Sequence, residues 1–367
     1  MRRTAAIVLL CGLAAVVGVV AQTNAGKTLD IYYIDTEGGQ STLFVGPTGE
    51  SLLVDTGNTG GRDLDRIVAA INAAGVKQID HMWTTHYHSD HVGAMEELAR
   101  RVPIKHFYDH GPVAANDRPT PPTFLAMYEA LSKGHRTTVK PGDKVPMAGL
   151  EIVTVTSNAV GIKTNLPGAG KPNPACAGVE KKDESAYFDP DNGSSAGFAM
   201  TFGKFRTVDL GDLTWNGELD IMCPANRIGT IDLYLVSHHG IDRSNSPALV
   251  HGLQPRVALM NNGTRKGGEA DAFRVLYESA GLENLWQLHW AYNTGLDNTP
   301  ATFVANVEDN ATIAGVLVPQ PGAPRGGGFG GAAHSPAYLI KVSAQQDGTF
   351  TVTNTRNGFS KTYRSRP

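Results

Sequence analysis

Four potential metal ligands stand within six residues, directly after an apolar segment of the chain. They are His86, His88, Asp90 and His91, in the order His-x-His-x-Asp-His. Imidazole and carboxylate groups suit zinc, and related sites hold manganese or iron. On a turn leaving a strand, His86 and His88 can point to one metal (the first metal) while Asp90 and His91 turn toward another (the second metal). Since the chain has only 12 histidines in 367 residues, this spacing indicates a metal site rather than a polar loop.

Polar side chains also follow two later apolar segments. Asp209 and Asp212 stand at the end of one, and His238 and His239 at the end of the other. Layered α/β folds collect their sites at strand ends, where a rigid sheet holds the loops. Three strand ends that carry His or Asp therefore predict one shared site.

The segments that must position these residues read as a mixed α/β fold. Residues 29–34, 41–45 and 51–55 alternate with tight turns and predict a meander of antiparallel strands. Apolar residues spaced by three and four predict a helix over 64–74, and a second helix is expected over 93–101. The histidine cluster lies between the two helices, after a strand that ends near Thr84.

The rest of the chain divides by composition. Residues 1–25 form one segment and 26–318 the main domain, with a loop insertion near 159–195 that is rich in Gly, Pro, Asn and Ser. Residues 319–336 form a Gly-rich loop. Residues 337–367 alternate apolar and polar side chains around two turns, which predicts β-hairpins packed on the main domain.

The first 25 residues are typical of a secretory signal peptide. Arg2 and Arg3 precede an uncharged apolar run from Ala5 to Val20, which small-residue cleavage sites follow. The alternative is an N-terminal membrane anchor, but the run is shorter than the ~20 residues that span a bilayer. We expect a periplasmic or secreted protein with no membrane association after cleavage.

Cysteine content and charge limit the partners. Removal of residues 1–25 leaves Cys176 and Cys223, which predict a structural disulfide in an oxidising compartment, the alternative being two buried thiols. The chain has 32 Lys and Arg against 35 Asp and Glu, with no long run of one sign. This gives no strong nucleic-acid signal. A small-molecule or cell-envelope substrate is expected, and the oligomeric state stays open.

The segment Thr84–Gly93 resembles the His-x-His-x-Asp-His motif of the metallo-β-lactamase superfamily, whose other markers follow in order along residues 29–260. The resemblance implies a four-layer αββα sandwich. It implies that Asp55 orients the histidine loop and that Asp212, rather than Asp209, bridges two metals. It also implies His239 as the last ligand, with His238 as a neighbouring or proton-handling residue.

The sequence around these motifs is similar to that of the metallo-β-lactamase domain of competence DNA-uptake proteins, notably at residues 35–42 and 236–240. The same branch includes exported phosphodiesterases acting on cell-wall choline esters. The sequence departs from the pattern of many members in one respect, because no further histidine in a recognisable motif stands between the His-x-His-x-Asp-His loop and Asp212. Water, Asn158 or one of His106, His110 and His135 would have to complete the first metal site.

The resemblance implies a hydrolase that uses a metal-activated water, with two zinc ions expected and manganese or iron as alternatives. Asp90, Asp212 and Asp55 are the predicted catalytic carboxylates. A phosphodiester is the expected substrate, a lactone, ester or β-lactam is the first alternative, and a non-hydrolytic metal-binding or di-iron redox protein is the second. Arg265 and Lys266 either bind an anionic substrate group or form a basic surface turn. His289, between aromatic residues, is expected to be structural.

Overall fold

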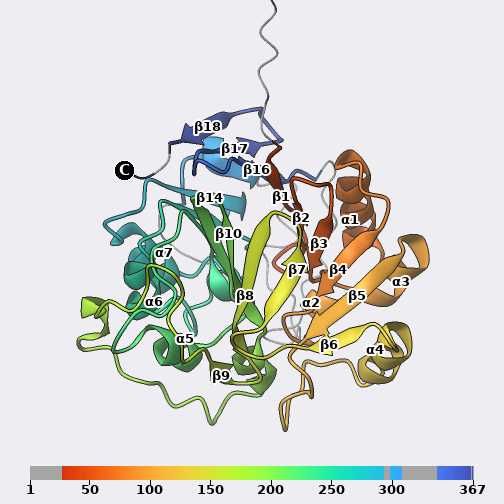
Figure 1. Ribbon diagram of the computed structural model, residues 1–367, viewed down its shortest axis with the longest axis horizontal. Coiled ribbons are helices and arrows are strands. Elements are labelled where there is room, and N and C mark those ends of the chain that lie inside the picture. Colours follow the sequence, from red (N-terminus) through yellow and green to blue (C-terminus); the bar gives the residue numbers. More distant parts are fainter. Residues whose placement is uncertain (1–26, 293–297, 308–336, 365, 367) are drawn as a thin grey trace, which may run out of the picture.

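The computed structural model describes residues 27–292, 298–307, 337–364 and 366 (Figure 1). The predicted signal peptide and the Gly-rich segment 319–336 lie outside these residues. None of the described helices is long and apolar enough to cross a membrane.

Two sheets, each with nine strands among the described residues, form the centre of the fold. In spatial order, the first contains β18 (Ser360–Tyr363), β17 (Phe350–Asn354), β16 (Ile340–Ala344), β1 (Leu29–Tyr33), β2 (Thr42–Val45), β3 (Ser51–Val54), β4 (Ile79–Trp83), β5 (Ile104–Asp109) and β6 (Arg136–Thr138). The second contains β15 (Val304–Asn306), β14 (Asn284–His289), β13 (Val257–Met260), β12 (Leu233–Leu235), β11 (Phe205–Asp209), β10 (Gly197–Phe202), β8 (Leu150–Ser157) and β7 (Lys144–Met147), and β9 (Val160–Gly161) pairs with β8.

Helices cover the outer face of each sheet (Figure 1). On the first sheet these are α1 (Arg62–Ala73), α3 (Met95–Arg101) and α4 (Phe124–Ser132), and on the second they are α5 (Trp215–Met222), α6 (Pro247–Leu253) and α7 (Ala270–Tyr277). The short helix α2 (Ser89–Val92) and the 3-10 turns η1 (Pro174–Cys176), η2 (Pro190–Ser194), η3 (Ser237–Gly240) and η4 (Ala301–Phe303) lie in connections. The layers are therefore helix, sheet, sheet and helix, and the αββα prediction is confirmed.

The alternation of side chains along the strands explains why the sheets pack on both faces. Leu52 and Trp83 point into the core between the two sheets, whereas their neighbours Leu53 and Met82 point to the core beneath α1 and α3. Successive residues of a strand face opposite sides of a sheet. β3 is buried throughout and β4 at every residue except Asp80, which is what a sheet covered on both faces requires.

The predicted meander β1–β2–β3 is antiparallel, as expected. The C-terminal hairpins extend the same sheet, because β16 pairs antiparallel with β1. The helix predicted over 93–101 is present as α3, which begins two residues later at Met95, and Gly93 lies between it and α2. A Cβ on Gly93 would lie 2.3 Å from the backbone nitrogen of Thr59, so only glycine fits this close approach.

The insertion near 159–195 forms a long loop with only β9, η1 and η2 as regular structure. The predicted disulfide between Cys176 and Cys223 is present and ties this loop to the end of α5. Asn173 adds a second attachment, because its amide donates to the carbonyls of Met222 and Ala248. The insertion is therefore held on the second sheet's helical layer, and its end, η2, reaches the metal-loop residues.

Candidate metal centre

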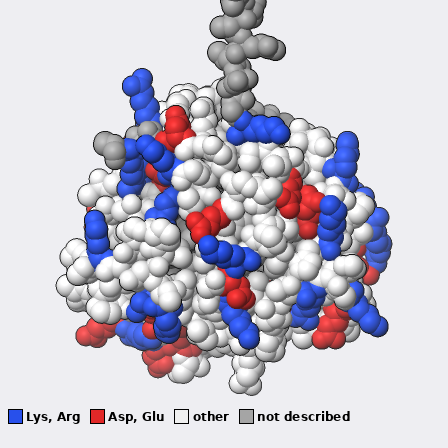
Figure 2. Space-filling model, in the orientation of Figure 1, with Lys and Arg blue, Asp and Glu red and all other residues white. Residues whose placement is uncertain are grey.

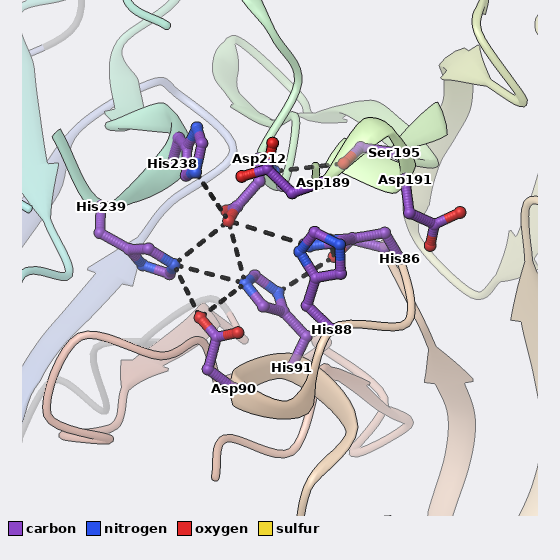
Figure 3. A network of polar contacts seen from close by, with 12 residues as sticks. His86, His88, Asp90, His91, Asp189, Asp191, Ser195, Asp212, His238 and His239 are labelled. Carbon is purple, nitrogen blue, oxygen red and sulfur yellow. Dashed lines mark hydrogen bonds and ion pairs between the residues drawn. The ribbon is translucent and has the colours of Figure 1, made fainter. Parts of the chain in front are cut away.

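The three polar strand ends meet at one place between the sheets. The loop after β4 carries His86 and His88, the turn after β11 carries Asp212, and η3 after β12 carries His239. In Figure 3, dashed lines from four histidines converge on Asp212 Oδ2. The shared site expected from the sequence is thus assembled by strands of both sheets.

The backbone at this site is strained. Asp55, His238 and His239 have φ values of 57°, 52° and 55°, in the left-handed region that residues other than glycine rarely adopt. Such conformations persist where surrounding structure fixes them, and they cluster at functional sites. The strain marks the same three side chains that sequence reasoning placed at the site.

Asp90, His91, Asp212 and His239 form a compact cluster whose ligand atoms all lie within 4.8 Å of one another. Asp90 Oδ2 is 3.5 Å from His91 Nε2 and 3.4 Å from His239 Nε2. Asp212 Oδ2 is 3.2 and 3.3 Å from the same two nitrogens, which are 3.3 Å apart. Atoms bound about 2.0–2.1 Å from a tetrahedral ion are separated by about 3.3–3.4 Å. The two imidazoles and two carboxylates therefore fit a tetrahedral divalent cation.

Asp55 fixes the orientation of His91. Its Oδ2 lies 2.7 Å from His91 Nδ1, and it also accepts hydrogen bonds from the backbone N–H and the hydroxyl of Thr85. A carboxylate on one ring nitrogen sets the tautomer and directs the other nitrogen to a metal. Asp55 thus points His91 Nε2 at the cluster.

Charge at the cluster is unbalanced toward the negative. Burial alone would lower the pKa of His91, but Asp212, Asp90 and Asp55 raise it well above its usual value. Burial alone would raise the pKa of Asp212, but His239, His91 and His238 hold it well below its usual range. Three carboxylates meet here and the Lys266 ammonium contacts one of them, Asp90, so a divalent cation would supply the remaining positive charge.

The first-metal side contains donor atoms with no partner. His86 Nε2 is buried, has no hydrogen-bond partner and lies 3.9 Å from Asp212 Oδ2. Burial, followed by the nearby His91 and His88, lowers the pKa of His86 well below its usual value, so its ring is neutral as a metal ligand must be. The rings of His86 and His88 have centroids 4.4 Å apart. His86, His88 and Asp212 are therefore arranged as a second set of donors.

Asp117 is a functional residue that the sequence analysis missed. Its Oδ1 lies 3.0 Å from His88 Nε2 and its Oδ2 accepts from the backbone and hydroxyl of Thr120. The contact leaves His88 Nδ1 as the nitrogen available to a metal, in the same way that Asp55 leaves Nε2 of His91. Asp117 lies in a loop without a recognisable motif, so no local signal marked it.

His238 and Asp209 lie beside the cluster. His238 Nε2 is 3.5 Å from Asp212 Oδ2 and its Nδ1 is 3.2 Å from the Ser244 hydroxyl. Burial lowers the pKa of His238 to about 3, so the ring is neutral at pH 7. Asp209 accepts hydrogen bonds from Gln40 and the backbone of Gly211 and thus shapes the turn that presents Asp212.

Among the described residues, none of the three candidate histidines lies with His86 and His88. His110 is buried, but its Nε2 contacts Asp191 Oδ2 at 3.2 Å. His106 bonds to Thr137 on the neighbouring strand, and His135 is exposed. Asn158 is also exposed. None of these four residues lines the cleft described next, so the expectation that one of them completes the site has no support here.

A cleft of about 300 Å³ opens onto the metal-ligand residues. Its lining includes His88, Asp90, Asp212, His238 and Asn192 and, from other loops, Phe188, Arg243, Arg265 and Lys266. The Lys266 ammonium contacts Asp90 Oδ2, and the Arg243 guanidinium forms two hydrogen bonds with Asp189, at 2.8 and 2.7 Å. The cleft thus combines carboxylates and imidazoles on its floor with three basic side chains on its wall.

His289 belongs to a different cluster. Its Nε2 lies 2.7 Å from Asp35 Oδ1, and Glu37 is nearby. Arg66 Nη1 lies 2.8 Å from Asp35 Oδ2 and 3.3 Å from Glu37 Oε1. A guanidinium supplies positive charge there, and the structural role expected for His289 stays a prediction.

Residues 35–151 match the family model described as Metallo-beta-lactamase superfamily. This part of the chain is therefore similar to that superfamily. ComE operon protein 3 of Bacillus subtilis (strain 168) is 24% identical over 197 residues, which are 54% of this chain and 22% of that protein. The chain therefore corresponds to about a fifth of that relative's length.

Solved structures share the fold at low identity. The metallo-beta-lactamase fold protein YhfI from Bacillus subtilis is 14% identical with a TM-score of 0.44, covering 71% of this chain and 96% of that one. CmlA, a diiron beta-hydroxylase from Streptomyces venezuelae, is 13% identical with a TM-score of 0.38, covering 70% of this chain and 48% of that one.

Proposed function

We propose that this chain is an exported hydrolase of phosphodiesters that binds two divalent metal ions, zinc being expected and manganese or iron the alternatives. The observation that carries the proposal is the cleft in which the donors of two adjacent metal positions face three basic side chains. When bound, such ions supply Lewis acidity and an activated water at neutral pH. The donors present fit this role in number, type and spacing.

The residues of the site have two roles, binding the metals and orienting the histidines that bind them. Asp90, His91, Asp212 and His239 would hold the second metal, and His86, His88 and Asp212 would contribute to the first. Asp55 and Asp117 orient one histidine of each group. Because these carboxylates lie behind the rings, the imidazoles can bind metal without rearrangement.

The basic wall of the cleft favours an anionic substrate. Lys266 and Arg265 follow β13 and line the cleft opposite His88, and Arg243 lies beside His238 in the same lining. Ammonium and guanidinium groups are the usual partners of phosphate oxygens. A neutral lactone or ester would not use these basic groups, two of which, Lys266 and Arg243, pair with Asp90 and Asp189.

The size and surroundings of the cleft favour a small or terminal substrate. A volume of about 300 Å³ is at the small end of ligand sites. On the face shown in Figure 2, Lys and Arg are interspersed with Asp and Glu rather than gathered in a broad basic band. A small molecule or the end of a cell-envelope polymer fits these features better than a long nucleic acid.

Export is part of the same proposal. It is supported by the signal-peptide pattern of residues 1–25 and by the Cys176–Cys223 disulfide, since such bonds persist mainly in oxidising compartments. Detection of the processed chain in the periplasm or medium, with its N-terminus after residue 21 or 25, would test it. A full-length chain retained in the cytoplasm would contradict it.

The activity is tested with a chromogenic panel of phosphodiesters, lactones, carboxylic esters and β-lactams. We expect hydrolysis of an aryl phosphodiester that is abolished by chelation and by Asp212→Ala. Asp220→Ala is the control, because Asp220 is a partly exposed carboxylate that pairs with Lys181 outside the donor set. Activity confined to lactones or β-lactams would reject phosphodiesters as the substrate class. A metal-loaded protein that hydrolyses nothing in the panel would contradict the proposal of a hydrolase.

A further inference from the structure

Asn192 has a buried oxygen with no hydrogen-bond partner. Its side chain is 1% exposed, and its Oδ1 finds no donor among the described residues. The residue nevertheless lines the cleft together with His88 and Asp212. A buried carbonyl oxygen without a donor is uncommon in folded proteins, and a bound ion or water is one way to satisfy it.

The segment that carries Asn192 is attached to the first-metal residues on both sides. The preceding residue, Asp191, accepts a hydrogen bond of 2.9 Å from the backbone N–H of Tyr87, between His86 and His88. After it, Ser195 Oγ accepts from the Asp212 backbone at 3.2 Å. Figure 3 shows Asp191 and Ser195 beside His86 and Asp212.

The other carboxylates of this segment already have partners. Both oxygens of Asp189 bind the Arg243 guanidinium. Asp191 Oδ1 accepts from the Ala114 backbone, and Oδ2 accepts from the backbone of Tyr87 and contacts His110. Asn192 Oδ1 is therefore the side-chain donor of this segment that remains for a metal.

We infer that Asn192 Oδ1 is a ligand of the first metal, together with His86, His88 and Asp212. This assignment rests on the proposed two-metal centre. It pairs two orphaned buried atoms, His86 Nε2 and Asn192 Oδ1, through one ion. It also explains how the site forms without the additional histidine that many members of the superfamily carry.

The identity of the donor has a consequence for the metal. An amide oxygen is a harder donor than an imidazole nitrogen, and oxygen ligands suit manganese whereas imidazole suits zinc. The first metal is therefore held by two nitrogens and two oxygens. Replacing Asn192 with histidine should shift this position toward zinc.

The test measures binding of Zn²⁺ and Mn²⁺ to metal-free full-length mature protein, with a competing chromophoric chelator and elemental analysis. The variants are Asn192→Ala and Asn192→His, and the control is Asn158→Gly, which changes an exposed Asn at a φ of 50° to the residue that tolerates it best. Thermal unfolding of each metal-free variant shows whether it is folded.

We expect two ions per chain in the parent and the Asn158→Gly control, and one in Asn192→Ala at the same free metal. Asn192→His should keep two ions and bind Zn²⁺ at the weaker site at least about tenfold more tightly. A weaker-site affinity in folded Asn192→Ala within twofold of the parent would overturn the assignment, as would a parent that binds one ion at saturation.

Asn192→His decides the matter if Asn192→Ala does not fold, because an unchanged preference between Zn²⁺ and Mn²⁺ in a folded histidine variant overturns the assignment. The outcome is separable from that of the proposed activity. Loss of one ion in Asn192→Ala from a protein that hydrolyses no phosphodiester would keep Asn192 as a ligand and reject the phosphodiesterase. If the parent hydrolyses phosphodiesters and the Asn192→Ala variant still binds two ions, the phosphodiesterase is kept and Asn192 is rejected as a ligand.

Discussion

The two halves of the metal centre are built differently. On the second-metal side, Asp90, His91, Asp212 and His239 already point at one another with tetrahedral spacing. On the first-metal side, His86 Nε2 has no partner and lies 3.9 Å from Asp212 Oδ2. The second-metal side is closed by charge pairs, whereas the first-metal side leaves the neutral His86 ring with an unpartnered nitrogen among the described residues. We therefore expect the second metal to bind more tightly and the first metal to exchange more readily.

Asp212 is common to both halves, so its loss should have the largest effect. Asp212→Ala removes the oxygen that lies 3.2–3.9 Å from the histidines of both groups. We expect at least about a 10³-fold fall in kcat/KM, since several kcal/mol of electrostatic stabilisation are lost. Steady-state kinetics with elemental analysis checks this, and an Asp212→Ala variant with both ions and more than a tenth of the activity would break the comparison.

Asp55 supports only the second-metal side. Asp55→Asn keeps the shape but removes the carboxylate 2.7 Å from His91 Nδ1. We expect affinity for the more tightly bound ion to fall about 10–100-fold, with the weaker ion affected less. Competition titration with a chelator measures both sites, and an equal loss at the two sites would contradict the division between them.

Asp117 is the corresponding residue on the first-metal side. Asp117→Asn should weaken the more exchangeable ion by about tenfold, because the side chain orients His88 from the edge of the cleft. The tightly bound ion should be unchanged. The same titration checks this, and a loss confined to the tight site would mean that the contacts of Asp117 and Asp55 have been assigned to the wrong halves.

Lys266 tests whether a basic residue of the cleft binds the substrate without being needed for metal binding. Lys266→Ala should raise KM for an aryl phosphodiester about five- to tenfold, which is the effect of losing one partly exposed charge contact of about 1 kcal/mol. Metal content should stay at two ions. Lys144→Ala is the matched control, since Lys144 is exposed and pairs with Glu151 on β7 and β8. An unchanged KM for the phosphodiester would remove Lys266 from substrate binding.

The sequence predicts the second-metal side better than the first because the residues of the second-metal side stand in local motifs, whereas two residues of the first-metal side depend on contacts between loops distant in sequence. Asp90 and His91 stand in one tight motif, and His239 follows a strand with a characteristic ending. Asp117 and Asn192 act through contacts between distant loops with no motif of their own. Nothing in residue type or spacing distinguishes them from other polar loop residues.

The fold shows the same limit. Strands with alternating or continuous apolar residues were predictable because the pattern itself is the cause of burial on each face. The start of α3 at Met95, two residues after the predicted start, was not, since Gly93 packs against the backbone of Asn58 and Thr59. Local patterns thus specify elements, and tertiary approach specifies where they stop.

The central claim is a two-metal hydrolytic centre, and the most direct measurement is phosphodiester hydrolysis by the metal-free mature protein as metal is added back. We predict little activity after the first equivalent, which fills the second-metal side, and a steep rise as the second equivalent binds beside His86 and His88. Activity that is complete at one equivalent, or that persists without metal, would contradict the account.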